Sequence, residues 1–242
     1  MIIRQIFLSC LLLGTAALII TNHLYSQPVY SLGVSLITLL QGLSSPSLDL
    51  FFVGFTKAAE FTFGETLALP ALVLMKRRLT AFCLFLFLIA NTSLSAMLKL
   101  VHAEPRPYWT HPHIHVMESY CPKDYGLPSG HVEYSASVIL VFILEVADPR
   151  RQVRNWGLIV TIIGLVCLSR LYLGHHSLDQ VIYGLCLGLS MSCLYFHGLQ
   201  KTFRRLLLEQ KLVTQKILTV GISCAVVFIS YVIYESNETR IR

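Results

Sequence analysis

Long apolar stretches, separated by short polar segments, are the feature of this sequence that most constrains its fold. A helix needs roughly 20 mostly apolar residues to cross the hydrocarbon core of a bilayer. Only 13% of the 242 residues are charged, whereas a typical soluble domain carries about 25%. The sequence therefore predicts an all-α, polytopic membrane bundle with about seven spans. These spans are expected near residues 5–23, 58–75, 79–101, 130–147, 156–174, 178–199 and 217–234.

Two stretches near the N-terminus need separate treatment. Residues 28–56 are apolar but are interrupted by glycines and by Ser44-Ser45-Pro46. This stretch is expected either to lie in the membrane interface or to re-enter the bilayer. The first span follows Arg4, as in a signal peptide, but it lacks a clear small-x-small cleavage site, and we expect it to be retained.

Blocks of positive charge predict how the spans are oriented. Lysines and arginines cluster at residues 76–78, 150–154 and 201–211. If the spans alternate, all three blocks lie on the same side as the N-terminus, and the positive-inside rule makes that side cytoplasmic. The long loop at residues 102–129 and the short loop at residues 175–177 then face the non-cytoplasmic side.

Three spaced motifs lie at the non-cytoplasmic ends of these predicted helices. The first is Lys-x6-Arg-Pro, which begins at Lys99, and the second is Pro-Ser-Gly-His, which ends at His131. The third is Ser-Arg-x5-His, which contains Arg170 and His176. A cation at membrane depth costs about 3 kcal/mol on insertion scales, so Lys99 and Arg170 are candidates for a functional role. We expect the three motifs to meet at one face of the bundle.

The residue types in these motifs suit the transfer of a phosphoryl group. Lys99, Arg106 and Arg170 can stabilise the negative charge that spreads over three phosphoryl oxygens. Ser129 and Gly130 stand where a helix begins, and free backbone N–H groups at such a position bind anions. One histidine can attack phosphorus, and another can protonate the leaving oxygen. No carboxylate cluster is offered to a metal, so we expect neither a metal nor another cofactor.

The three motifs resemble those of the type 2 phosphatidic acid phosphatase superfamily, which includes lipid phosphatases, glucose-6-phosphatase and vanadium haloperoxidases. The resemblance covers roughly residues 45–200 and implies a six-helix phosphatase core with a phosphohistidine intermediate. Residues 1–44 would then add an N-terminal span and an interfacial segment, and residues 201–242 a basic linker and a C-terminal span. The resemblance implies that His176 is the nucleophile and His131 the general acid. It also implies that the phosphate is held by Lys99, Arg106, Ser129, Gly130 and Arg170.

One position departs from the pattern of the family. The third motif usually continues His-x3-Asp, and the Asp orients the nucleophile. The residue four after His176 is Gln180, whereas Asp179 stands four after His175. We favour His176, because its distance from Ser169-Arg170 fits the motif. Gln180 would share its helix face and accept the ring N–H without supplying charge, although Asp179 stays open as the orienting residue.

The sequence therefore predicts a metal-independent membrane phosphatase that hydrolyses a phosphate monoester at the non-cytoplasmic face. We expect a lipid phosphate as the substrate and the bilayer as the only other partner, with no role for nucleic acid. Glucose-6-phosphatase resembles this chain in having Gln at the orienting position, so a sugar phosphatase is one alternative. The others are a phosphotransferase that uses another alcohol as acceptor, and a catalytically silent binding protein on the same fold.

Overall fold

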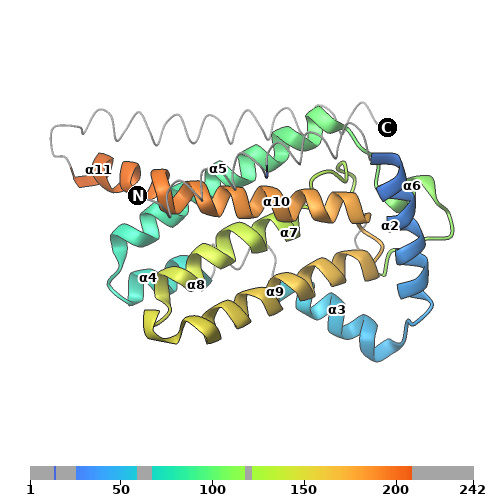
Figure 1. Ribbon diagram of the computed structural model, residues 1–242, viewed down its shortest axis with the longest axis horizontal. Coiled ribbons are helices and arrows are strands. Elements are labelled where there is room, and N and C mark those ends of the chain that lie inside the picture. The colour runs from blue at the N-terminus through green and yellow to red at the C-terminus, as the bar shows by residue number, and fades with distance from the viewer. Residues whose placement is uncertain (1–13, 15–25, 59–66, 118–121, 209–242) are drawn as a thin grey trace.

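The computed structural model describes residues 26–58, 67–117 and 122–208, together with Gly14, and these residues form a bundle of helices (Figure 1). Every regular element within these ranges is a helix, which confirms the predicted all-α class. The elements are α2 (Ser26–Gln41), α3 (Pro46–Ala58), α4 (Leu69–Leu74), α5 (Arg78–His102), α6 (Pro107–Thr110), α7 (Gly130–Tyr134), η2 (Ser135–Ile139), α8 (Leu140–Val146), η3 (Pro149–Arg151), α9 (Gln152–Tyr172), α10 (Leu178–Leu194), η4 (Tyr195–Leu199) and α11 (Gln200–Leu208).

Three helical segments within the described part of the chain are long and apolar enough to cross a membrane by length and composition. They are Arg78–Thr110, Gln152–Tyr172 and Leu178–Arg205, and they fall on three of the predicted spans. These helices support the prediction of an integral membrane protein. Helices α7, η2 and α8 follow one another without a break over residues 130–146, where a further span was predicted.

The remaining predicted spans fall partly or wholly outside the described residues. This holds for the spans at residues 5–23 and 217–234 and for the first part of the span at residues 58–75. The last part of that span contains the six-residue helix α4.

The apolar stretch at residues 28–56 forms the two helices α2 and α3, which are joined by a short turn at residues 42–45. In Figure 1, α2 runs across the end of the bundle at which α9 ends and α10 begins. A Cβ atom at Gly33 of α2 would lie 2.5 Å from the backbone nitrogen of Leu178, so α2 packs closely on the start of α10. This crosswise arrangement favours the interfacial alternative for α2.

Helices α7 and α10 approach each other closely through two glycines. A Cβ atom at Gly184 would lie 2.6 Å from the carbonyl oxygen of Ser129, and one at Gly188 would lie 2.3 Å from that of Glu133. The two glycines are four residues apart and share one face of α10, and small residues at this spacing allow helix backbones to come close in membrane proteins. The contact places the Pro-Ser-Gly-His segment beside the N-terminal half of α10.

Candidate active site

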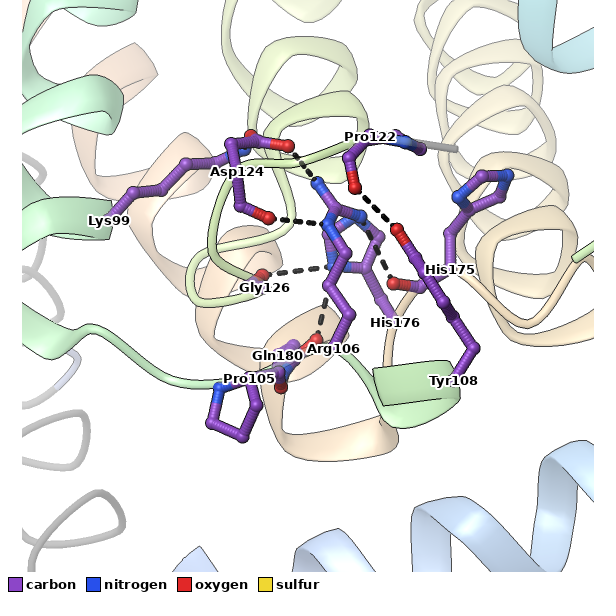
Figure 2. Close-up of polar contacts among 10 residues, drawn as sticks. All are labelled: Lys99, Pro105, Arg106, Tyr108, Pro122, Asp124, Gly126, His175, His176 and Gln180. Carbon is purple, nitrogen blue, oxygen red and sulfur yellow. Dashed lines mark hydrogen bonds and ion pairs between the residues drawn. The ribbon is translucent and has the colours of Figure 1, made fainter. Parts of the chain in front are cut away.

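The three motifs meet at one end of the bundle. Lys99 lies in the last turn of α5, and Arg106 directly precedes α6. Both side chains bind Asp124, and Arg106 also lies 3.1 Å from the ring of His176 (Figure 2). The Pro-Ser-Gly-His segment joins them through a hydrogen bond from the Ser129 backbone N–H to the carbonyl oxygen of Gln180, at 3.1 Å. The structure thus brings together segments that are up to 77 residues apart in the chain.

A tight turn explains the spacing of the third motif. Helix α9 ends at Tyr172, and Gly174 then adopts a φ of +75°, a left-handed conformation that favours glycine. The chain therefore folds back on the helix end, and the backbone N–H groups of His175 and His176 both donate to the carbonyl oxygen of Arg170, at 3.2 and 3.4 Å. His176 follows Arg170 by six residues, and the turn therefore places it beside the last turn of α9, which carries Arg170.

The hydrogen bonds of His176 define which ring nitrogen carries the proton. Nδ1 lies 2.9 Å from the carbonyl oxygen of Gly126 and 3.2 Å from Oε1 of Gln180, and both of these atoms can only accept. Nε2 lies 3.1 Å from Nη1 of Arg106, which can only donate. The network therefore assigns the proton to Nδ1 and a lone pair to Nε2.

The surroundings of His176 keep its ring neutral. The side chain is 1% exposed, and this burial lowers the pKa of His176 well below the ordinary value of 6.5. The nearby cations Arg106, Arg170 and Lys99 lower the pKa further. A neutral imidazole with its Nε2 lone pair toward a cluster of cations can act as a nucleophile toward a bound anion.

The amide of Gln180 is oriented by four contacts. Its Oε1 accepts from the Ser177 backbone N–H at 3.4 Å and from Nδ1 of His176. Its Nε2 donates to Oε1 of Glu104 at 2.8 Å and to the carbonyl oxygen of Pro105 at 2.9 Å. The contact with Ser177 belongs to a capping box at the start of α10. Gln180 therefore holds the helix start and the ring of His176 at the same time.

Asp179 and His175, the other half of the ambiguous third motif, make different contacts. Asp179 accepts a hydrogen bond from Oγ of Ser177 at 2.5 Å. The ring of His175 lies edge-on to that of Tyr108, with the ring centroids 6.3 Å apart. The geometry thus places Gln180, rather than Asp179, at Nδ1 of His176, and the orienting role of Gln180 stays a prediction.

Asp124 is a site residue that the sequence did not single out. Its carboxylate forms an ion pair with Lys99 and accepts from Nη2 of Arg106 at 2.6 Å, and its carbonyl oxygen accepts from Nε of Arg106 at 2.8 Å. Burial acts to raise the pKa of Asp124, but the charges of Lys99 and Arg106 outweigh burial and hold this pKa well below its usual range. The ionised Asp124 therefore partly neutralises two of the three proposed phosphate-binding cations.

The backbone N–H group of Ser129 is already occupied. It donates to the carbonyl oxygen of Gln180, because Gly184 lets α10 approach the segment, and the role of Ser129 in phosphate binding stays a prediction. The hydroxyl of Ser129 is buried and has no hydrogen-bond partner among the described residues. The hydroxyl group of Ser129 and the N–H of Gly130, the first residue of α7, are thus the groups that this segment offers to an anion.

Within residues 26–58, 67–117 and 122–208, His, Cys, Asp and Glu side chains form no group of three or more that could hold a metal ion.

Two solved structures share this architecture. A phosphatidylglycerolphosphate phosphatase from Bacillus subtilis, described as a transmembrane PAP2 type enzyme, superposes with a TM-score of 0.61 at 21% identity, and the match covers 85% of this chain and 97% of that one. LpxE from Aquifex aeolicus superposes with a TM-score of 0.58 at 20% identity, over 68% of this chain and 94% of that one. At these identities the likeness concerns the fold.

Sequence comparison identifies the family. No curated protein matches this chain, but the sequence profile of the PAP2 superfamily matches residues 80–204. This range is more than half of the 242 residues and includes all three motifs. The resemblance noted from these motifs is thereby confirmed, and the chain belongs to the PAP2 superfamily.

Proposed function

We propose that this protein is a membrane phosphatase that hydrolyses a lipid phosphate monoester through a phosphohistidine intermediate, without a metal. The observation that carries the proposal is the state of the His176 ring. Nδ1 is held by two acceptors, and the lone pair of Nε2 faces Nη1 of Arg106 at 3.1 Å. A phosphate that accepts from Arg106 would bring its phosphorus atom next to this lone pair.

The reaction would proceed in two steps. In the first step, Nε2 of His176 forms a bond to phosphorus while the bond from phosphorus to the alcohol oxygen breaks, and His131 gives its proton to that oxygen. In the second step, water attacks phosphorus, the bond to nitrogen breaks, and His131 takes up the proton of the water. The cations Lys99, Arg106 and Arg170 stabilise the transferred group in both steps.

A lipid substrate is favoured by the position of the site. The site lies where three candidate membrane helices end or begin, and the phosphate of a lipid headgroup lies at the corresponding depth of a bilayer. The Bacillus subtilis protein of the same fold is named for its action on phosphatidylglycerolphosphate. The charge blocks in the sequence favour the non-cytoplasmic face for this end of the bundle.

His176→Ala tests the mechanism in purified protein with a lipid phosphate in detergent micelles. We expect kcat to fall by about 10⁴-fold or more, as for other catalytic nucleophiles, whereas His197→Ala in η4 should keep its activity. Wild-type protein quenched in alkali after exposure to radiolabelled substrate should carry label on His176. Full activity of His176→Ala, or label on another residue, would contradict the mechanism. Activity that EDTA removes and an added metal restores would contradict metal independence.

A water-soluble sugar phosphate is a second candidate substrate, and one observation favours it. Gln180 lies at Nδ1 of His176, and the resemblance to glucose-6-phosphatase includes a Gln at this position. An assay that compares phosphatidic acid, phosphatidylglycerolphosphate and glucose 6-phosphate at equal concentration separates the two candidates. A kcat/KM for glucose 6-phosphate above that for both lipids would replace the lipid proposal.

A further inference from the structure

Glu104 holds both groups that accept the proton of the His176 ring. Its backbone carbonyl oxygen accepts from the N–H of Gly126 at 2.8 Å, and the carbonyl oxygen of Gly126 in turn lies 2.9 Å from Nδ1 of His176. Its carboxylate accepts from Nε2 of Gln180 at 2.8 Å, and Oε1 of Gln180 lies 3.2 Å from the same Nδ1. The two acceptors come from different parts of the chain, and Glu104 joins them.

The amide of Gln180 is fixed in the orientation that such a relay needs. Its Nε2 faces two acceptors and its Oε1 faces two donors, so a flipped amide would oppose all four contacts. The Gln180 side chain is also closely enclosed, because a Cβ atom at Gly126 would lie 2.4 Å from its Oε1. A carboxylate hydrogen-bonded to one end of an amide polarises it and makes the oxygen at the other end a stronger acceptor.

We propose that Glu104 is a positioning residue for the nucleophile: through the amide of Gln180 and the backbone of Gly126, it fixes both acceptors of the His176 ring proton. This inference rests on the proposed function of His176. Two fixed acceptors hold the ring proton on Nδ1. They therefore keep the lone pair on Nε2 and stabilise the proton on Nδ1 when Nε2 bonds to phosphorus.

Other titratable groups lie near the carboxyl group of Glu104: Asp179 of α10, Tyr30 of α2, and His111, which follows α6. Glu104, Tyr30 and His111 line one open pocket with a volume of about 320 Å³. The hydrogen bond from Gln180 needs only an oxygen acceptor on Glu104, so the positioning role does not depend on the charge of this side chain.

Glu104→Leu tests the hydrogen bond, because it removes the acceptor of Gln180 and keeps a side chain of similar size. We expect kcat to fall about tenfold while KM stays within about twofold. Glu104→Gln supplies an amide oxygen that can accept from Gln180, so this conservative variant should restore most of the kcat that Glu104→Leu loses. A purely structural role would not separate the two variants in this way.

The control is Glu145→Leu, which makes the same chemical change at the opposite end of the bundle and should leave kcat unchanged. A wild-type kcat in folded Glu104→Leu would overturn the inference, as would a loss confined to KM or an equal loss in Glu104→Gln. If Glu104→Leu does not fold, Glu104→Asp carries the test: the longer gap to Gln180 should lower kcat at constant KM, and a wild-type kcat would overturn the inference.

A measurement without substrate separates this inference from the proposed function. In protein with nitrogen-labelled histidine rings, the NMR signals that His176→Ala removes report which ring nitrogen of His176 carries the proton. In Glu104→Leu these signals should move toward those of a mixture of the two tautomers, even if no phosphate ester is cleaved. Inactivity of the wild type on every ester would thus reject the proposed function alone, whereas identical signals in wild type and Glu104→Leu would reject the role of Glu104 alone.

Discussion

Asp124 holds Arg106 at two points, with its carboxylate on Nη2 at 2.6 Å and its carbonyl oxygen on Nε at 2.8 Å. The same carboxylate pairs with Lys99. An anion thus already sits between two cations that we assign to phosphate binding. In the free protein, the negative charge of Asp124 offsets the repulsion between these two cations. A bound phosphate would compete with Asp124 for both of them.

The first prediction concerns Asp124→Asn, which removes the charge and replaces the carboxylate oxygen that pairs with Lys99 by an NH2 group. The remaining side-chain oxygen and the backbone carbonyl oxygen can still accept from Arg106. Because Lys99 and Arg106 would then be two partly buried cations without a counter-charge, we expect a loss of about 3 kcal/mol of stability at pH 7. The pKa of Asp124 is depressed in the folded protein, so its contribution is present above the ordinary Asp pKa of about 3.9 and fades as the pH falls below it. The difference in Tm between variant and wild type should shrink in the same direction.

The same variant should bind vanadate more tightly, because a competing anion is gone. We expect Ki for vanadate to fall about fivefold and vanadate to raise Tm more in Asp124→Asn than in the wild type. Asp148→Asn is the control, since the ion pair of Asp148 with Arg151 is exposed and lies at the other end of α9. Weaker vanadate binding by Asp124→Asn would show that Asp124 orders the cations rather than competing with the ligand.

The second prediction concerns the pH dependence of the wild-type enzyme. His176 must be neutral to attack phosphorus, and burial together with the neighbouring cations lowers its pKa well below 6.5. The neutral form therefore persists as the pH falls through 6.5, and the acidic limb of kcat/KM should lie below that pH. Initial rates between pH 4 and 9 at low substrate concentration measure it. An acidic limb at or above pH 6.5 would contradict the assignment of His176 as the nucleophile.

The sequence predicts the site well where local geometry sets the spacing. Arg170 and His176 come together because a helix end and one left-handed glycine separate them. Gln180 reaches the ring because four residues form about one helical turn. The long apolar runs likewise locate α5, α9 and α10 to within a few residues, since a bilayer dictates their length.

The remaining features depend on contacts across the fold, which spacing does not encode. Glu104 lies inside the first motif, and that position was its only signal in the sequence. Asp124 was equally inconspicuous as a single acid in a polar loop. The partner of the Ser129 N–H is a carbonyl oxygen 51 residues away, at Gln180. This hydrogen bond depends on the close approach of α7 to α10, which Gly184 allows, and the spacing of the motifs does not reveal it.

The third prediction tests that approach. Gly188→Ala would place a Cβ atom 2.3 Å from the carbonyl oxygen of Glu133, so α7 has to move. We expect a loss of about 1–3 kcal/mol of stability and lower kcat, because α7 carries His131. Gly164→Ala in α9 is the matched control, since nothing lies within 4 Å of its new Cβ atom, and a helical Ala gains about 1 kcal/mol over Gly. Equal Tm values for the two variants, measured in the same detergent, would contradict the close packing of α7 on α10.

The fourth prediction exchanges the acid and the amide behind His176. Gln180→Glu alone would point a carboxylate at two acceptors, Glu104 and the carbonyl oxygen of Pro105, which now receive hydrogen bonds from the Gln180 amide. We expect a loss of about 2 kcal/mol of stability or more, from like charges and lost hydrogen bonds, and with it a loss of activity.

The double variant Q180E/E104Q should reverse most of this loss. Its new amide can donate to the new carboxylate, which then accepts from Nδ1 of His176 directly. We therefore expect kcat of the double variant to exceed that of Gln180→Glu by at least about tenfold, a coupling of about 1.4 kcal/mol in a double-mutant cycle. Additive effects of the two substitutions would mean that Glu104 and Gln180 act independently on the nucleophile. A coupling of this size would instead mean that the two residues hold Nδ1 of His176 as one hydrogen-bonded unit.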